Sequence, residues 1–175
     1  MSNYQPPVII QHSPIFRHLA YAGGLPLLYG AIIFYALTRR QRGPRTRALI
    51  TWKDKVLLVR NVADHNRWTL PGGGPKPSES YIASIARELR EELSIRQPAE
   101  KLQLIKQYDK TEVGEPYDKI CYSLDLSGSR LSKITLSNEI LEARWFSTTR
   151  LPLRLSPVVE LALRDHFVRQ SRHSS

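Results

Sequence analysis

The feature that most limits how this 175-residue chain can fold is the stretch from 79 to 95, which follows three consecutive glycines. Apolar residues recur there at steps of three and four, so a helix over residues 79–93 would bury one stripe against a protein core. The stripe consists of Ile82, Ile85, Ala86, Leu89 and Leu93. The opposite face carries Glu88, Glu91 and Glu92 at i, i+3 and i+4, which places three carboxylates side by side. The sequence therefore predicts a helix with one packed face and one acidic face.

The acidic face needs a compensating cation, because like charges at this spacing repel one another. Ligand sets made only of oxygen suit Mg²⁺ first and Mn²⁺ second, and protein-bound Mg²⁺ usually combines a few carboxylates with substrate phosphates. Arg87 can pair with neighbouring carboxylates and orient them without binding a metal itself. We therefore expect a divalent metal site on this face.

The residues before the helix predict a loop that can approach a ligand closely. Residues 68–70 form a strand candidate, and Pro-Gly-Gly-Gly-Pro at 71–75 forces a tight loop. Ser78 is the expected N-cap, and Glu79 would then lie in the first turn, where the helix dipole favours a negative charge. A strand, a glycine loop and an acidic helix together indicate a site for phosphate and metal.

This arrangement resembles the signature of the Nudix hydrolases, Gly-x5-Glu-x7-Arg-Glu-U-x-Glu-Glu-x-Gly-U, where U is a bulky aliphatic residue. Residues 73–95 match every fixed position except the second glycine, which is Ser94 in this chain. We expect Ser94 to end the helix in the same left-handed turn, at a cost of about 1 kcal/mol. The resemblance covers roughly residues 47–169, including the lead-in at 70–74 and a late strand at 139–146.

The resemblance implies an α/β fold, an α/β/α sandwich with a mixed β-sheet, and hydrolysis of a nucleoside diphosphate linked to another moiety. It implies Mg²⁺ or Mn²⁺ as cofactor, Arg87 as an orienting residue, and Glu79 as a ligand that acts through water. The implied metal-binding residues are Gly72 through its carbonyl, Glu79, Glu88, Glu91 and Glu92.

The resemblance leaves the general base open, because the family places it variously within the signature or on a later loop. Glu91 or Glu92 is the first choice, and Glu139 is the leading candidate outside the helix. Behind them come Glu112, Glu115 and Glu142. Each of the glutamates outside the helix, taken singly, is more readily explained as a solvated surface charge.

Two other hypotheses remain beside the hydrolase. One is a catalytically idle nucleotide-binding or regulatory module tethered to the membrane, which the loss of Glu88, Glu91 or Glu92 would have favoured. The other is recruitment of a membrane partner by the apolar segment. The patterns expected downstream for ADP-ribose or dinucleoside polyphosphate substrates, and upstream for coenzyme A, do not occur. Nucleoside triphosphates, nucleotide sugars and lipid-linked diphosphates therefore stay open as substrates.

The second constraining feature is the uncharged run at 19–37. A helix of this length would span about 28 Å, close to the hydrocarbon thickness of a bilayer. Several arginines follow it between 39 and 47, whereas only Arg17 precedes it, so the positive-inside rule places the C-terminal part in the cytoplasm. We expect a single-pass transmembrane helix at 19–38, with lipid contact through residues 19–47. An in-plane or hairpin-like membrane segment and a buried helix of a larger fold are the alternatives.

Charge and cysteine content narrow the partners. The formal net charge is +10, and the arginines near the apolar run suit an anionic leaflet better than nucleic acid, which we do not expect as a partner. Cys121 is the only cysteine, so no intrachain disulfide forms, and we expect a buried thiol. The histidines lack the spacing of zinc ligands. The oligomeric state stays open.

The chain order predicts an N-terminal tail at 1–18, the span at 19–38, a basic linker at 39–46, a Nudix domain at 47–169 and a disordered tail at 170–175. Within the domain we expect a hairpin from 48–52 and 56–59, and further strands at 102–108, 119–126 and 143–146. A helix at 157–169, capped by Ser156, would close the domain.

Overall fold

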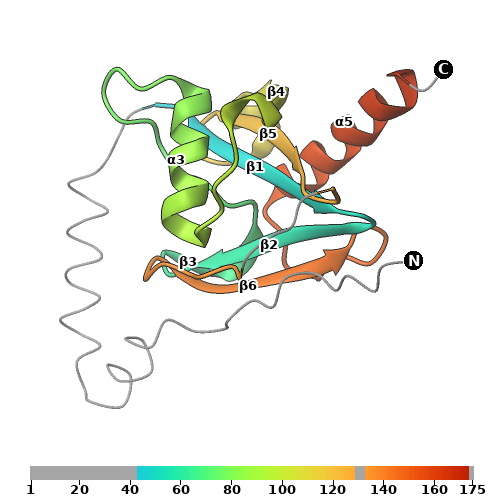
Figure 1. The fold of residues 1–175 in the computed structure, drawn as a ribbon, viewed down its shortest axis with the longest axis horizontal. Helices are drawn as coiled ribbons and strands as arrows, with labels where there is room; N and C mark the ends of the chain where they lie inside the picture. Colours follow the sequence, from blue (N-terminus) through green and yellow to red (C-terminus); the bar gives the residue numbers. More distant parts are fainter. Residues whose placement is uncertain (1–42, 129–132, 174–175) are drawn as a thin grey trace, which may run out of the picture.

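Six β-strands form the centre of the structure, a computed structural model that describes residues 43–128 and 133–173 (Figure 1). The strands are β1 (Arg45–Trp52), β2 (Lys55–Asn61), β3 (Asp64–Thr69), β4 (Gln103–Tyr108), β5 (Lys119–Asp125) and β6 (Ile140–Ser147). The helices are α3 (Tyr81–Leu93), α4 (Lys110–Val113), α5 (Pro157–His173) and the single 3₁₀ turn η1 (Ala99–Lys101). The strand order is β3-β2-β1-β5-β4, with β6 paired to β2. Because β1 and β5 run parallel and the other pairs run antiparallel, the sheet is mixed, as predicted.

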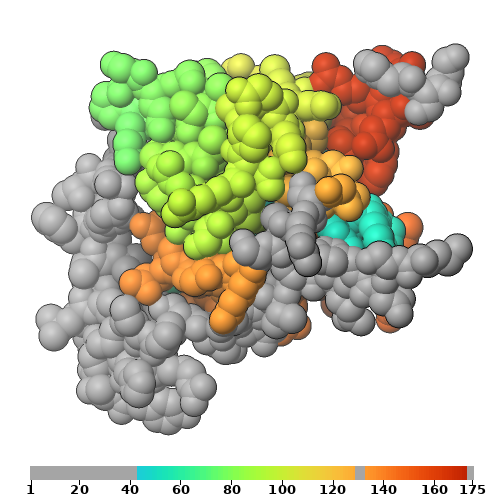
Figure 2. Space-filling view, viewed as in Figure 1, coloured from blue at the N-terminus to red at the C-terminus, as the bar shows by residue number. Residues whose placement is uncertain are grey.

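The helices α3 and α5 cover opposite faces of the sheet (Figure 1). Alternate residues of β1 explain this, because successive side chains of a strand point to opposite faces. Ala48 and Ile50 belong to the cluster that contains Leu89 of α3, whereas Leu49 belongs to the cluster that contains Leu163 of α5. The central strands are therefore apolar on both sides, which is the pattern of a sheet buried between two layers. The last turns of α5 project beyond the sheet (Figures 1 and 2).

An opening between β1 and β2 positions the glycine loop. The antiparallel ladder between these strands covers only residues 50–52 of β1. Nearer the start of β1, the amides of Thr46 and Ala48 donate to the carbonyls of Gly73 (2.8 Å) and Pro71 (3.0 Å). The loop after β3 is thus bonded to the main chain of β1 much as a neighbouring strand would be. This pairing fixes the backbone of the glycine loop.

The start of α3 differs from the prediction. The N-cap is Ser80, whose hydroxyl accepts a hydrogen bond from the amide of Ala83 at 3.3 Å. Ser78 lies two residues earlier in a left-handed conformation with φ of 64°, so it cannot serve as the predicted cap. Glu79 consequently lies before the helix, where its carboxylate accepts from the amide of Lys76 at 2.8 Å.

The end of α3 agrees with the prediction for Ser94. This residue adopts the left-handed conformation with φ of 58° and ψ of 21°, and its amide donates to the carbonyl of Arg90 at 3.1 Å. A serine in this conformation carries the steric cost of a Cβ, which a glycine would not carry.

Two predicted boundaries are wrong. β1 begins at Arg45, so the last residues of the predicted basic linker are strand residues held by the parallel ladder with β5. At the other end, α5 continues to His173 instead of stopping at Arg169. A contact of 3.0 Å between the side chains of His166 and Gln170 accompanies this extension, so the predicted disorder at 170–175 does not hold for its first four residues.

Local side-chain bonding also refines two expectations. The segment between the strands predicted at 102–108 and 119–126 contains the short helix α4, capped by Asp109. Ser156 precedes α5 as predicted, but its hydroxyl donates to the carboxylate of Glu115. Cys121 is fully buried as predicted, and burial raises the pKa of its thiol to about 12.

The predicted tail at 1–18 and the predicted span at 19–38 lie outside the described residues. Among the residues that the structure describes, no helix combines the length and apolarity needed to cross a membrane.

Candidate active site

The glycine loop requires glycine at two positions. Gly72 has φ of 129°, and a Cβ added there would collide with the carbonyl of Thr46 in β1. A Cβ on Gly73 would lie 2.5 Å from a carboxylate oxygen of Glu88. The loop therefore approaches β1 on one side and the acidic face of α3 on the other, and only glycine leaves room for both.

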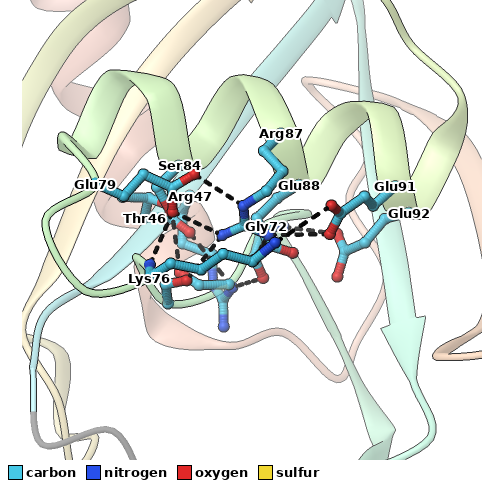
Figure 3. A network of polar contacts seen from close by, with 12 residues as sticks. Thr46, Arg47, Gly72, Lys76, Glu79, Ser84, Arg87, Glu88, Glu91 and Glu92 are labelled. Atoms are coloured by element: carbon cyan, nitrogen blue, oxygen red, sulfur yellow. Dashed lines mark hydrogen bonds and ion pairs between the residues drawn. The ribbon is translucent and has the colours of Figure 1, made fainter.

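Arg87 gathers the acidic residues of the predicted site (Figure 3). Its guanidinium donates to both carboxylate oxygens of Glu79, at 2.9 and 3.0 Å. It also donates to Glu88 at 2.8 Å and to Glu91 at 3.0 Å, and a further hydrogen bond of 3.1 Å reaches the carbonyl of Gly74. One side chain therefore links two carboxylates of α3 to a third that precedes the helix and to the glycine loop, and the orienting role of Arg87 stays a prediction.

Glu79 is the most fully compensated of these carboxylates. The hydrogen bonds from Arg87, joined by the amide of Lys76, lower the pKa of Glu79 to about 2. The same contact with Glu79 raises the pKa of Arg87 further above its ordinary value. The pair is a fixed ionic link that closes the loop between β3 and α3.

Glu92 is in the opposite situation. It is only 6% exposed, and among the described residues its carboxylate accepts one hydrogen bond, from the amide of Gly72 at 2.8 Å. Burial, followed by the charge of Glu88, raises the pKa of Glu92 to about 8, although Arg47 and the Gly72 amide act against the rise. Because a buried carboxylate without a full set of partners is costly, Glu92 is a strong candidate for cation binding.

Glu88 and Glu91 complete the acidic face. Burial raises the pKa of Glu88, and the charges of Glu91 and Glu139 add to the rise that Arg87 opposes. The Glu91 side chain is 49% exposed and lies 3.9 Å from the ammonium of Lys76. One face of α3 thus runs from a buried carboxylate to a solvent-facing one.

The four later glutamates fall into two groups. Glu139 is exposed just before β6, and its charge adds to the rise in the pKa of Glu88 and of Glu92, so it lies near the acidic site. The other three are engaged elsewhere, which makes them weaker candidates for a base. Glu112 pairs with Lys106 at 2.7 Å, Glu115 pairs with Lys119 at 2.8 Å, and Glu142 pairs with both Arg60 and Arg144. Glu115 and Glu142 are not the solvated surface charges that the sequence suggested, because both side chains are largely buried.

Sequence reasoning missed Arg47, which it counted among the membrane-facing cations. The structure places this residue in β1, where its guanidinium donates to the carbonyl of Gly72 and, at 3.4 Å, to the carbonyl of Thr46. No local motif marks Arg47, because its role depends on the loop that packs against β1 more than twenty residues later.

The donor set fits a divalent cation. Glu79, Glu88 and Glu91 are hydrogen-bonded to Arg87, and Glu92 lies beside them on the Gly72 amide. Burial raises the pKa of Glu88 and of Glu92. All the available ligands are oxygens, which suits Mg²⁺ or Mn²⁺. In the described part of the chain, no group of three or more acidic, histidine or cysteine side chains is already arranged around one point. Arg87 holds its three carboxylates by direct hydrogen bonds instead.

The comparison with protein families identifies the class. The profile of the NUDIX domain matches residues 41–165, most of the chain, so the chain belongs to this family. The predicted enzyme class, a Nudix pyrophosphohydrolase, is confirmed at the level of the family.

Individual relatives are distant. The human 8-oxo-dGDP phosphatase NUDT18 is 28% identical over 127 residues, which cover 69% of this chain and 38% of that protein. The chain thus spans well under half the length of this relative. The structure of a MutT NUDIX hydrolase from Burkholderia pseudomallei is similar with a TM-score of 0.58 and 22% identity, covering 71% of this chain and 98% of the other. A UDP-X diphosphatase matches with a TM-score of 0.60 and 22% identity over 80% of this chain and 72% of its own. At these identities the structural matches establish the fold.

Proposed function

We propose that the chain hydrolyses a pyrophosphate bond in a nucleoside diphosphate linked to another moiety, such as a nucleoside triphosphate or a nucleotide sugar. One observation carries the proposal: Glu79, Glu88 and Glu91 are gathered on Arg87, and the undercompensated Glu92 is bonded to the glycine loop next to them. A structural helix gains nothing from like charges at this spacing, whereas a site for metal and phosphate requires them.

Glu88, Glu91 and Glu92 are the residues that would hold Mg²⁺ or Mn²⁺, with the Gly72 carbonyl as a further donor and Glu79 acting through water. When bound, the ion would neutralise phosphate oxygens and lower the pKa of a water molecule. Arg87 is already the donor that fixes Glu79, Glu88 and Glu91 relative to one another, so it would keep the ligands oriented.

The reaction also needs a base for the attacking water. The water oxygen forms a new bond to one phosphorus, the bond from that phosphorus to the bridging oxygen breaks, and the base accepts a water proton. Glu92 is a poor base in this geometry, because it is buried against the amide of Gly72. Glu91 is half exposed and Glu139 is exposed, so one of these two carboxylates would accept the proton.

The relatives and the charge of the chain support a choice of substrates to test first. The name of the human relative makes 8-oxo-dGDP the first nucleoside diphosphate to test, and the UDP-X diphosphatase adds nucleotide sugars. The net charge of +10 would favour the approach of a polyanion. Lipid-linked diphosphates also remain within the proposal, because of the apolar run at 19–37.

A single-pass anchor at 19–38, with the domain on the cytoplasmic face, belongs to the same proposal. It is supported by the uncharged run and by the arginines that follow it. Alkaline carbonate extraction of membranes from expressing cells tests it, because an integral anchor stays in the pellet. Release of the chain into the supernatant would refute the anchor and leave the hydrolase proposal intact.

The decisive experiment is a turnover assay on the whole 175-residue chain in mild detergent. The panel comprises 8-oxo-dGDP, nucleoside triphosphates, a UDP-sugar, ADP-ribose and a dinucleoside polyphosphate, each with Mg²⁺, Mn²⁺ or EDTA. We expect metal-dependent release of a mononucleotide or phosphate that Glu91→Gln abolishes and Glu160→Gln, an exposed glutamate of α5, leaves unchanged. Nucleotide binding without turnover, in folded protein and in every metal condition, would favour the idle binding module instead.

A further inference from the structure

We propose that Arg47 is a positioning residue of this active site: it holds the carbonyl of Gly72, whose amide holds Glu92, and so fixes both oxygens for the metal. The inference rests on the proposed function of the site, because it assigns Gly72 and Glu92 to the same ion.

Gly72 is held from both sides of the loop. Its amide donates to Glu92 of α3 at 2.8 Å, and its carbonyl accepts from the guanidinium of Arg47 in β1. The same nitrogen of Arg47 lies 3.4 Å from the carbonyl of Thr46, so the guanidinium bridges β1 and the glycine loop. Without this bridge, the Gly72 carbonyl would lose its only side-chain donor among the described residues.

Rotation of the Gly72 peptide groups would otherwise be easy. The residue has φ of 129°, a region that glycine enters and leaves without a steric barrier from a Cβ. The neighbouring backbone bonds from β1 reach Pro71 and Gly73 and leave Gly72 itself unpaired within that ladder. The side chain of Arg47 therefore supplies the contact that the strand ladder omits.

A cation at this position would not by itself help to bind another cation. The positive charge of Arg47 repels a divalent ion, so a purely electrostatic view predicts tighter metal binding when Arg47 is removed. A carbonyl oxygen has two lone pairs, and one remains for a metal when Arg47 occupies the other. Positioning therefore predicts weaker metal binding on removal of Arg47, and the sign of the change separates the two views.

Mn²⁺ binding to the whole chain in detergent, without substrate, tests the proposal. The free-ion signal in electron paramagnetic resonance reports the bound fraction. Arg47→Met, which retains an apolar stem, should weaken Mn²⁺ binding about tenfold, as expected for residues that orient metal ligands. Arg47→Lys should fall between Arg47→Met and wild type, because its single ammonium can still reach one carbonyl.

Arg45→Met is the matched control. Arg45 lies two residues earlier on the same strand, and its guanidinium stacks on the ring of Tyr117 at 4.9 Å. The substitution therefore removes the same charge as Arg47→Met and leaves the side-chain contact to Gly72 intact. We expect its Mn²⁺ affinity to equal that of wild type or to rise slightly. Thermal unfolding of the metal-free variants shows whether each is folded.

The outcomes are distinct. Unchanged or tighter Mn²⁺ binding in folded Arg47→Met would overturn the proposal, as would equal weakening in Arg45→Met. If Arg47→Met does not fold, Arg47→Lys decides, and an affinity equal to or above wild type overturns the proposal. A chain that binds Mn²⁺ but hydrolyses nothing in the panel would refute the proposed reaction and leave the metal-binding test valid. A wild-type chain that binds no Mn²⁺ would overturn both.

Discussion

The two faces of the sheet treat buried charge in opposite ways. On the α5 side, Lys119 is only 2% exposed and forms a 2.8 Å ion pair with Glu115, which also accepts from Ser156. On the α3 side, Glu92 is buried to a similar degree, and in the described part of the chain its carboxylate has one hydrogen-bond donor, the Gly72 amide. Burial is the main reason that its pKa is raised to about 8. Glu115 is thus paired with a basic side chain, whereas the carboxylate of Glu92 is hydrogen-bonded to a backbone amide instead.

This difference distinguishes buried charges that stabilise the fold from buried charges that are available to bind a ligand. Burial acts to raise the pKa of Glu115, but hydrogen bonds from Lys119 and Ser156 outweigh it and lower that pKa. Burial and the charge of Arg47 lower the pKa of Lys119. A matched pair of this kind ties β5 to the residue before α5, whereas an unmatched carboxylate costs stability unless an external cation completes it. The unmatched face is therefore the place to expect a ligand.

Removing a carboxylate from the unmatched face should give the largest effect. Glu92→Gln is expected to lower kcat about a thousandfold, since a metal ion supplies several kcal/mol to the transition state. The fold should persist, because the neutral amide is easier to bury than the carboxylate. Turnover at saturating metal and a thermal scan test this, with Glu160→Gln on the surface of α5 as the control. Retention of more than a tenth of wild-type kcat would show that Glu92 does not take part.

Removing a charge from the matched face should affect stability instead. Lys119→Met leaves Glu115 buried without its partner, so we expect the free energy of unfolding to fall by about 3 kcal/mol. Activity per folded molecule should change little. Urea unfolding measures the loss, and the exposed Lys133→Met is the control.

The double variant Lys119→Met/Glu115→Gln sharpens this test. It removes both charges and should recover part of the stability that Lys119→Met loses. If the double variant lost as much free energy of unfolding as the two single variants together, the charges of Lys119 and Glu115 would not be coupled.

Gly73→Ala should disturb the acidic face without breaking the fold. The new Cβ would lie 2.5 Å from a carboxylate oxygen of Glu88, so that side chain must move. We expect kcat to fall roughly tenfold, since small misplacements of catalytic groups are costly. Gly128→Ala is the matched control, because a Cβ there meets nothing within 4 Å. Equal kcat in the two variants would mean that the Glu88 side chain can shift without loss of activity.

The smallest expected effect is a pH dependence of the metal-free protein. The folded pKa of Glu92 is raised from 4.5 to about 8, so its contribution to stability is present below 4.5 and is lost as pH rises through 8. Between pH 5 and 8 in EDTA, wild type should lose about 1 kcal/mol or more that Glu92→Gln does not lose. Urea unfolding at both pH values measures this. The same pH dependence in both proteins would place the charge of Glu92 in a compensated environment.

The sequence predicted the acidic helix well because its signals are local. The apolar stripe and the glutamate spacing follow from helix geometry alone, and Ser94 ends α3 in the expected left-handed turn. The sequence predicted Ser78 as the N-cap of α3, whereas the N-cap is Ser80. Both residues are acceptable caps, and only the path of the loop selects between them. The mixed sheet came from the family resemblance, since strand pairing between distant segments has no local signal.

The sequence by itself determined which residues could carry charge on the acidic face, and it required glycines in the loop before it. Only the tertiary structure decided which charges are compensated. Glu115 and Glu142 look like ordinary surface glutamates in the sequence, yet both acquire basic partners when the strands assemble. Arg47 looked like one more cation beside the apolar run, and packing places it against Gly72. The reason is physical: the strength of a charge depends on its burial and on its neighbours, and in this fold those neighbours come from distant parts of the chain.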